Sequence, residues 1–272
     1  MARKRAVTFP GQGTTGGEVS GAIAEALRRR VGSGEPPYQL AVFASSVDLF
    51  YRLRDSGVEP DFVAGHSLGE YAAAHAAGSL RLEDGVRLVA ERDRLMTEAS
   101  EKTPGGMVAV IGADPAEVER AVGGAEGIVV AANFNTPRQT VLSGEKAALE
   151  GVVGEIKGRK VPLRVAGAFH SPLMEGAAVR MEELLASVGF AEPEVPMVGA
   201  AGGEVLRTAR AVRAALRDQM LLPVRWAAVM ERFFEMGVSE IFEAGEDGTL
   251  TRMLRDFKKS DVKGIAPKEA LS

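Results

Sequence analysis

The sequence contains no cysteine, and this absence removes several kinds of chemistry at once. Without thiols the chain can form no disulfides, no thiolate metal site and no cysteine nucleophile. Histidine is scarce as well, because His66, His75 and His170 are the only copies. Their spacing matches no pattern of metal ligands, so we expect no metal centre.

The sequence also lacks an excess of positive charge and any long apolar run. Its formal net charge of −4 gives no sign of nucleic-acid binding. No apolar stretch approaches the length needed to span a membrane. The apolar run that follows the basic N-terminus, Ala6-Val7-Thr8-Phe9, is too short for the core of a signal peptide. We therefore expect a cytoplasmic protein whose partners include neither nucleic acid nor membrane.

What is present is the composition of an ordinary globular enzyme. The 272 residues are 46% hydrophobic and 26% charged, which is enough for a sizeable core. This length suits either one large α/β domain or a core with an inserted subdomain.

The most informative stretch surrounds Ser67. The apolar run Phe62–Ala64 predicts a buried strand, the Ala-rich run Tyr71–Ala77 predicts a helix, and Gly-x-Ser-x-Gly lies between them. This is the pattern of a nucleophile elbow, in which glycine lets the backbone pass close on either side of the serine. The backbone N–H of Leu68 would point toward a developing oxyanion. A tight turn without catalytic function is the alternative interpretation.

A serine nucleophile needs a base, and the chain offers few. His66 is the neighbour of Ser67, so on a sharp turn its side chain points elsewhere. His75 lies two turns along the following helix. His170, on a loop about a hundred residues away in the sequence, is the base by elimination, as partners in a catalytic triad are commonly distant. A structural histidine is the alternative, and a backbone carbonyl could orient the ring because no acid stands out.

These residues predict ping-pong acyl transfer through an acyl-enzyme, with either water or a thiol as the acceptor. Arg92, in a long helix predicted over Leu82–Ser100, discriminates between substrates. A plain esterase has little use for a buried arginine, whereas an acyl group that ends in a carboxylate needs a bidentate partner.

The predicted strands and helices suggest an α/β core with an insertion. Between Thr103 and Ala166 the predicted order is β-α-β-β-α-β, the ferredoxin-like arrangement. We therefore expect a core of residues 1–102 and 167–272 and a subdomain of residues 103–166. A polar loop is expected over 133–138, and the polar tail from Lys258 is expected to fray.

Several motifs of the chain closely resemble the malonyl-CoA:acyl carrier protein transacylases, a family that includes the acyltransferase domains of fatty acid and polyketide synthases. They occur in the same order over nearly the whole chain. The resemblance implies a hydrolase-like α/β core with a mostly parallel sheet and an inserted ferredoxin-like subdomain. The motifs are Pro10-Gly11-Gln12-Gly13, Gly65-His66-Ser67-Leu68-Gly69-Glu70-Tyr71, Arg92-x-x-Leu95-Met96, Asn133-Phe134-Asn135-Thr136-Pro137 and Ala168-Phe169-His170-Ser171-Pro172-Leu173-Met174.

The resemblance implies a role for each matching residue. Ser67 would take a malonyl group from malonyl-CoA and pass it to the phosphopantetheine thiol of an acyl carrier protein. His170 would be the base, oriented by the main-chain carbonyl of Gln219, and the N–H groups of Gln12 and Leu68 would form the oxyanion hole. Coenzyme A thioester is then a substrate, and no cofactor is bound permanently.

The resemblance also implies the substrate contacts. Arg92 would hold the malonyl carboxylate, and a bulky Phe169 would leave no room for a 2-methyl branch, although one methyl discriminates by only about 1–3 kcal/mol. The other residues expected to contact the acyl group or coenzyme A are Gln39, His66, Asn133 and Asn135.

The chain departs from the family pattern in several places. Only 25 residues separate Gly13 from Gln39, about half of what typical members carry. Asp93 replaces a glycine beside Arg92, and Gly245-Glu246-Asp247-Gly248 replaces Gly-Pro-Gly. These departures suggest a divergent, shortened member, such as a discrete acyltransferase of a polyketide pathway. The alternatives are an editing acyl hydrolase that acts on carrier-bound acyl groups and a catalytically silent docking module. Two smaller departures are Gly199-Ala200-Ala201 and Arg138.

Overall fold

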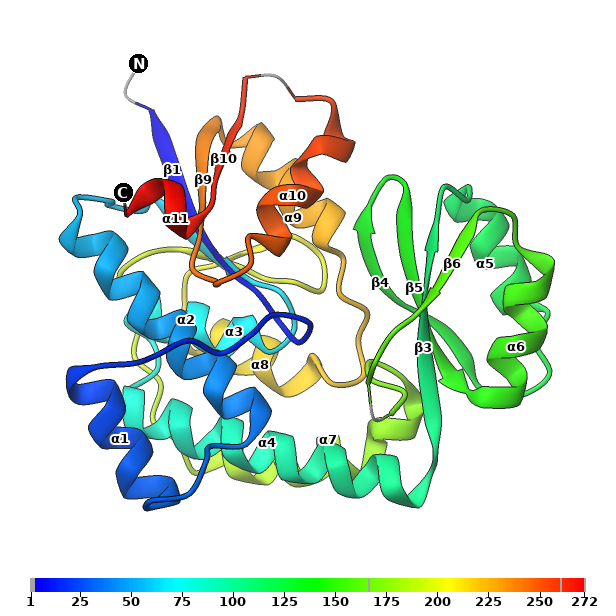
Figure 1. Cartoon of the computed structure of the whole chain (residues 1–272), viewed down its shortest axis with the longest axis horizontal. Coiled ribbons are helices and arrows are strands. Elements are labelled where there is room, and N and C mark those ends of the chain that lie inside the picture. The colour runs from blue at the N-terminus through cyan, green and yellow to red at the C-terminus, as the bar shows by residue number, and fades with distance from the viewer. Residues whose placement is uncertain (1–2, 166, 260, 272) are drawn as a thin grey trace.

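The computed structural model of the chain contains two β-sheets, each with its own helices (Figure 1). It describes residues 3–165, 167–259 and 261–271. The larger sheet and its helices hold both ends of the described chain, and the smaller sheet projects from one side (Figure 1). This arrangement confirms the predicted fold class.

The larger sheet has six strands in the order β10-β9-β1-β2-β7-β8. All neighbours are parallel except β7 and β8. Both faces of its central strands are buried, as is usual for parallel strands. The strands are β1 (Lys4–Phe9), β2 (Phe62–Gly65), β7 (Met197–Val198), β8 (Val205–Leu206), β9 (Val238–Glu243) and β10 (Lys263–Ile265).

Alternation along the central strands divides their side chains between two cores. Val7, Phe9 and Val63 pack in a core with α2, α3, α4 and α7, whereas Ala6 and Phe62 face a second core with α9. The helices around this sheet are α1 (Gly21–Val31), α2 (Tyr38–Asp55), α3 (Gly69–Ala76), α4 (Leu82–Lys102), η1 (Pro172–Met174), α7 (Glu175–Ala186), α8 (Ala209–Asp218), α9 (Trp226–Glu235), α10 (Thr249–Met253), η2 (Leu254–Phe257) and α11 (Pro267–Ala270).

The smaller sheet is antiparallel, with the order β4-β5-β3-β6. Its chain order, β3-α5-β4-β5-α6-β6, is the predicted ferredoxin-like arrangement. Val110 and Leu142 pack against α5 and α6 on one face. We propose residues 103–166 as the inserted subdomain, although its last residue, Ala166, lies outside the described ranges. The elements are β3 (Gly105–Ile111), α5 (Pro115–Gly123), β4 (Val129–Thr136), β5 (Gln139–Glu145), α6 (Lys146–Glu155) and β6 (Arg159–Pro162).

Strand β4 corrects the expectation of a polar loop over 133–138. The strand continues to Thr136, and only Pro137 and Arg138 form the turn. Its far end pairs on both sides, because Phe134 donates its backbone N–H to Val224 O at 2.8 Å while it also pairs with Thr140 of β5. These tertiary partners outweigh the local polarity of the segment, and they connect the smaller sheet to the larger domain.

The C-terminal segment is also more ordered than expected. Residues 263–265 form β10, which lies parallel to β9 with Ile265 opposite Phe242. Ile265 is buried at this edge of the sheet, and the short helix α11 follows. The frayed tail is therefore a wrong expectation for the described residues, because Ile265 lies in register with β9 and the α11 segment packs Pro267, Ala270 and Leu271 against the fold.

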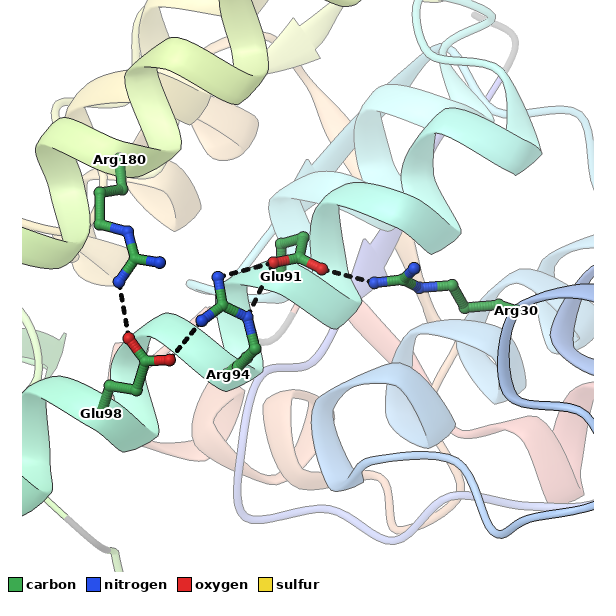
Figure 2. A network of polar contacts seen from close by, with 5 residues as sticks. All are labelled: Arg30, Glu91, Arg94, Glu98 and Arg180. Atoms are coloured by element: carbon green, nitrogen blue, oxygen red, sulfur yellow. Dashed lines mark hydrogen bonds and ion pairs between the residues drawn. The ribbon is translucent and has the colours of Figure 1, made fainter.

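An ion-pair network on the surface connects three helices (Figure 2). Arg30 of α1 lies 2.5 Å from Glu91 of α4, and Arg180 of α7 lies 2.6 Å from Glu98 of α4. Arg94 lies between the two glutamates and pairs with both. Exposed pairs contribute little singly, but a network fixes the relative positions of its helices more effectively. The network links α4, the helix that carries Arg92, to α1 and α7.

Candidate active site

Ser67 lies on a sharp turn between β2 and α3. Its φ of 54° is in the left-handed region, which costs a non-glycine residue about 1–3 kcal/mol. The flanking glycines are required by space. A Cβ at Gly65 would lie 2.1 Å from the backbone N of Glu70, and one at Gly69 would lie 2.1 Å from the backbone O of Phe9. The turn therefore has the geometry of a nucleophile elbow.

His170 meets Ser67 directly, with 2.7 Å between its Nε2 and the serine Oγ. The Nδ1 atom lies 2.7 Å from the carbonyl O of Gln219 and 3.1 Å from that of Leu222. Carbonyl oxygens only accept hydrogen bonds, so Nδ1 carries the proton and Nε2 is free to accept one from Ser67. The ring is thus already in the tautomer that a general base requires.

The electrostatics keep this imidazole neutral. Burial, which is the larger cause, and the positive charge of the nearby Arg92 guanidinium together lower the pKa of His170 to about 4. The ring is therefore unprotonated over the whole neutral range, as a base must be.

Arg92 is fully buried because it occupies the apolar face of α4, in register with Leu88 and Leu95. Arg94, by contrast, lies on the exposed face of the same helix. The Nη2 atom of Arg92 lies 3.2 Å from Ser67 Oγ. The helical periodicity of α4 therefore places Arg92 beside the nucleophile and leaves Arg94 at the surface.

The hydrogen-bond partners of Arg92 are neutral groups. It donates to Gln39 Oε1, and to Gln219 Oε1 at 3.1 Å. Its Nε lacks a partner within the described chain. A buried cation without an anionic partner is unfavourable, and a bound carboxylate would relieve it. The site therefore favours an anionic ligand.

Glu70 is the buried acid beside this cation, and our sequence reasoning assigned it no role. Its carboxyl accepts hydrogen bonds from Ala200 N at 2.9 Å and from Gln219 Nε2 at 3.3 Å. Burial raises the pKa of Glu70 to about 8, so it is largely protonated at neutral pH. It therefore offers little negative charge to Arg92 while it holds the Gln219 side chain.

The two predicted oxyanion donors flank the nucleophile. Leu68 follows Ser67 and caps the N-terminus of α3, where backbone N–H groups have no helical partners. Gln12 lies in the loop after β1. A Cβ at Gly11 would lie 2.6 Å from His66 O and 3.5 Å from Ser67 Cβ, so this loop packs directly on the elbow. The catalytic use of both N–H groups stays a prediction.

A cavity of about 360 Å³ opens in front of the serine, between the two sheets. The larger domain contributes Gln12, Ser67, Phe169 and His170 to its wall. The smaller sheet contributes the face that α5 and α6 leave uncovered, including Met107, Ala109, Val141 and Val161. A long substrate can therefore reach Ser67 along the junction.

Three further residues predicted to contact the substrate, His66, Asn133 and Asn135, line this cavity. Gln39 lines a second cavity, which is described below. His66 Nε2 lies 2.8 Å from Asn135 Oδ1, and burial lowers the pKa of His66. Asn135 also donates to Gln139 Oε1 at 2.7 Å. Asn133 and Asn135 are both buried in the cavity wall, and their contact with coenzyme A stays a prediction.

Asp93 is held by hydrogen bonds to Gln39, and its charge interacts with that of its neighbour Arg92. It lines a second cavity of about 440 Å³, together with Gln39, Met96 and Phe169. Burial raises the pKa of Asp93. Gln12 and Phe169 border both cavities, so the two spaces adjoin at these residues.

Two structural observations bear on metals and membranes. Within residues 3–165, 167–259 and 261–271, no three histidine or acidic side chains gather as a metal-binding group. Over the same ranges, every helix is too short or too polar to cross a bilayer.

Comparison with known proteins gives a consistent family. Residues 35–270 match the model of the acyl transferase domain. The malonyl CoA-acyl carrier protein transacylase of Salmonella typhimurium is 38% identical over 224 residues, which are 80% of this chain and 72% of that protein. The Bacillus subtilis protein of the same name is 33% identical over 228 residues, 81% of this chain and 72% of that protein.

Solved structures agree over nearly the whole chain. The Synechocystis malonyl-CoA:ACP transacylase superposes with a TM-score of 0.88 and 30% identity, covering 97% of each chain. A malonyl-transacylase in complex with its type II polyketide synthase acyl-carrier protein gives 0.84 and 30%, covering 97% of this chain and 96% of that one. The chain therefore belongs to the acyl transferase family, and its relatives there are the malonyl-CoA:acyl carrier protein transacylases.

Proposed function

We propose that this enzyme transfers a malonyl group from coenzyme A to the phosphopantetheine thiol of an acyl carrier protein, through an ester on Ser67. One observation carries the proposal. The Ser67 hydroxyl oxygen lies 2.7 Å from Nε2 of His170 and 3.2 Å from Nη2 of Arg92. The proposed base and the proposed carboxylate-binding cation therefore both contact the proposed nucleophile.

In the first half-reaction, Ser67 Oγ attacks the thioester carbonyl while His170 Nε2 accepts the hydroxyl proton. Negative charge develops on the carbonyl oxygen, where the N–H groups of Leu68 and Gln12 would stabilise it. The carbon–sulfur bond then breaks, and the thiolate of coenzyme A takes the proton from His170. The products are the malonyl ester and free coenzyme A.

The second half-reaction reverses these steps with another thiol. The phosphopantetheine thiol of the carrier gives its proton to His170 and attacks the ester carbonyl. When the carbon–oxygen bond breaks, Ser67 recovers that proton. The carbonyl oxygens of Gln219 and Leu222 hold the ring in one tautomer throughout, so the same nitrogen serves both half-reactions.

Arg92 supports a short dicarboxylic acyl group. In malonyl thioesters a single methylene separates the carboxylate from the reacting carbonyl. The position of the guanidinium beside Ser67 Oγ fits that short separation. A carboxylate bound there would replace the weak contact between Arg92 and the hydroxyl with a charge-assisted pair.

We further propose that Phe169 excludes 2-methyl branches, that Gln39 and His66 border the acyl group, and that Asn133 and Asn135 contact coenzyme A. Coenzyme A enters as a substrate, and we assign no resident cofactor. As coenzyme A thioesters and carrier proteins meet in the cytoplasm, we propose that the reaction occurs there.

The test follows the lifetime of the acyl-enzyme. The protein is exposed to malonyl-CoA, separated from excess substrate, and incubated with buffer alone or with a holo-carrier protein. We expect an ester that is stable in buffer and lost rapidly to the carrier, with a malonylated carrier as product.

Each alternative predicts another result. An editing hydrolase would lose the ester equally fast in buffer, and a silent docking module would form none. Ser67→Ala is the control, since it should give neither ester nor product. Either alternative result, obtained with folded protein, would contradict the proposal.

A further inference from the structure

The loop that carries the Gln12 N–H is held in place by side chains from two other parts of the fold. This oxyanion loop, residues 11–15, lies between β1 and the segment that leads to α1, and it has no helix or strand of its own. It packs against the elbow through Gly11. The position of the Gln12 N–H therefore depends on what holds the loop.

Tyr38, the first residue of α2, holds the part of the loop directly after Gln12. Its hydroxyl accepts a hydrogen bond from Gly13 N at 2.9 Å and donates one to Thr14 O at 2.8 Å. Both groups are backbone atoms directly after Gln12. A single hydroxyl thus fixes the peptide groups on the C-terminal side of the oxyanion donor.

Asp247, in the turn between β9 and α10, holds the next residues of the loop. Its Oδ2 accepts from Thr15 N at 2.8 Å, from Thr14 Oγ at 2.9 Å and from Thr15 Oγ at 3.2 Å. The hydrogen bond from Thr15 N lowers the pKa of Asp247, so the carboxylate is charged at neutral pH. Arg252 donates to the main-chain O of Asp247 and anchors the turn.

We propose that Asp247 and Tyr38 are positioning residues, which hold the oxyanion loop so that the Gln12 N–H faces the developing oxyanion. This rests on the proposed function, because it assumes acylation of Ser67 and Gln12 as an oxyanion donor. Neither side chain lines the cavity in front of Ser67. Their effect acts through the backbone of residues 13–15.

The first test compares Asp247→Ala with Asp247→Asn. Asparagine keeps an oxygen where the three hydrogen bonds converge, whereas alanine removes every acceptor. We expect Asp247→Ala to lower the rate constant of Ser67 acylation about 10- to 100-fold, below the roughly 10²- to 10³-fold typical for the loss of an oxyanion donor. KM for malonyl-CoA should stay within about twofold, and Asp247→Asn should restore most of the rate.

Tyr38→Phe removes the hydroxyl that binds Gly13 and Thr14. Like Asp247→Ala, it should lower the rate constant of Ser67 acylation. Glu246→Gln is the matched control, because Glu246 occupies the same turn but contacts Ser45 of α2 rather than the oxyanion loop. It should acylate at the wild-type rate. Amide hydrogen exchange of the peptide that contains residues 11–15 should accelerate in Asp247→Ala and stay unchanged in Glu246→Gln.

All rates are taken per active site, from the amplitude of single-turnover acylation, so that misfolded protein does not enter the comparison. An unchanged rate constant in Asp247→Ala would overturn the proposal, and so would equal losses in the alanine and asparagine variants. If the wild-type protein forms no ester on Ser67, the proposed function fails instead. The two failures are therefore distinguishable.

Discussion

The guanidinium of Arg92 lies 3.2 Å from the hydroxyl oxygen of Ser67, although 25 positions separate the two residues in the sequence. Before substrate binds, the cation is a hydrogen-bond donor to the nucleophile. When a carboxylate binds, the cation would exchange this contact for a charge-assisted pair. We propose that Arg92 thereby couples recognition of the acyl group to release of the serine for attack.

Replacing Arg92 should change which acyl group is transferred. In Arg92→Ala, kcat/KM for malonyl-CoA should fall relative to that for acetyl-CoA by about 10- to 150-fold, which corresponds to a charge-assisted contact of about 1.5–3 kcal/mol. Steady-state transfer of both substrates gives the ratio. Arg94→Ala, from the exposed face of the same helix, should leave the ratio unchanged. Equal losses with both substrates would show that Arg92 only supports the structure.

The pH profile should report the lowered pKa of His170. Because the folded-state pKa is about 4, kcat/KM for malonyl-CoA should stay level from pH 8 down to about 5, without a fall near 6.5. In Arg92→Ala the acidic limb should move to higher pH, since the guanidinium is one cause of the low pKa. His170→Ala should reduce acylation about 10²- to 10⁴-fold. A wild-type limb near 6.5 would contradict the electrostatic account.

Glu70 should make the fold less stable as pH rises. Its folded-state pKa of about 8 exceeds the unfolded value of 4.5, so the folded state holds a proton that the unfolded state loses between these values. The stabilisation is complete below pH 4.5 and is lost as pH approaches 8. Melting temperatures at pH 5, 6.5 and 8 should therefore decline more steeply in wild type than in Glu70→Gln. The exposed control Glu231→Gln should follow wild type, and parallel curves for all three would contradict the assignment.

Phe169 should control tolerance of a branched acyl group. It is buried and borders both cavities beside Ser67. In Phe169→Ala, the preference for malonyl-CoA over methylmalonyl-CoA should shrink by about 10- to 200-fold, the effect expected of one methyl group in a tight pocket. Competition between the two substrates measures the preference directly. An unchanged preference would mean that another surface excludes the branch.

Short sequence motifs predicted the parts of the site that depend on residues close together in the sequence. The elbow around Ser67 follows from a strand, a tight turn and a helix in succession. Arg92 was singled out because an acyl group that ends in a carboxylate needs a bidentate partner, and the structure shows it buried on the apolar face of α4. His170 emerged by elimination, since only three histidines exist.

The remaining parts depend on contacts between distant segments. Glu70 accepts a hydrogen bond from Ala200, 130 positions away, and Thr14 and Asp247 are separated by 233 positions. A pattern in one short segment carries no information about such partners. For the same reason, the end of β4 was expected to be a loop, because its pairing with Val224 lies outside the local sequence.

The most direct test of the account is the site of acylation. The protein is incubated briefly with malonyl-CoA, its intact mass is measured, and the modified peptide is sequenced by mass spectrometry. The account predicts one malonyl group per chain, on Ser67, which is absent from Ser67→Ala and strongly delayed in His170→Ala. A malonyl group on another residue, or its persistence in Ser67→Ala, would contradict the claim that this serine is the nucleophile.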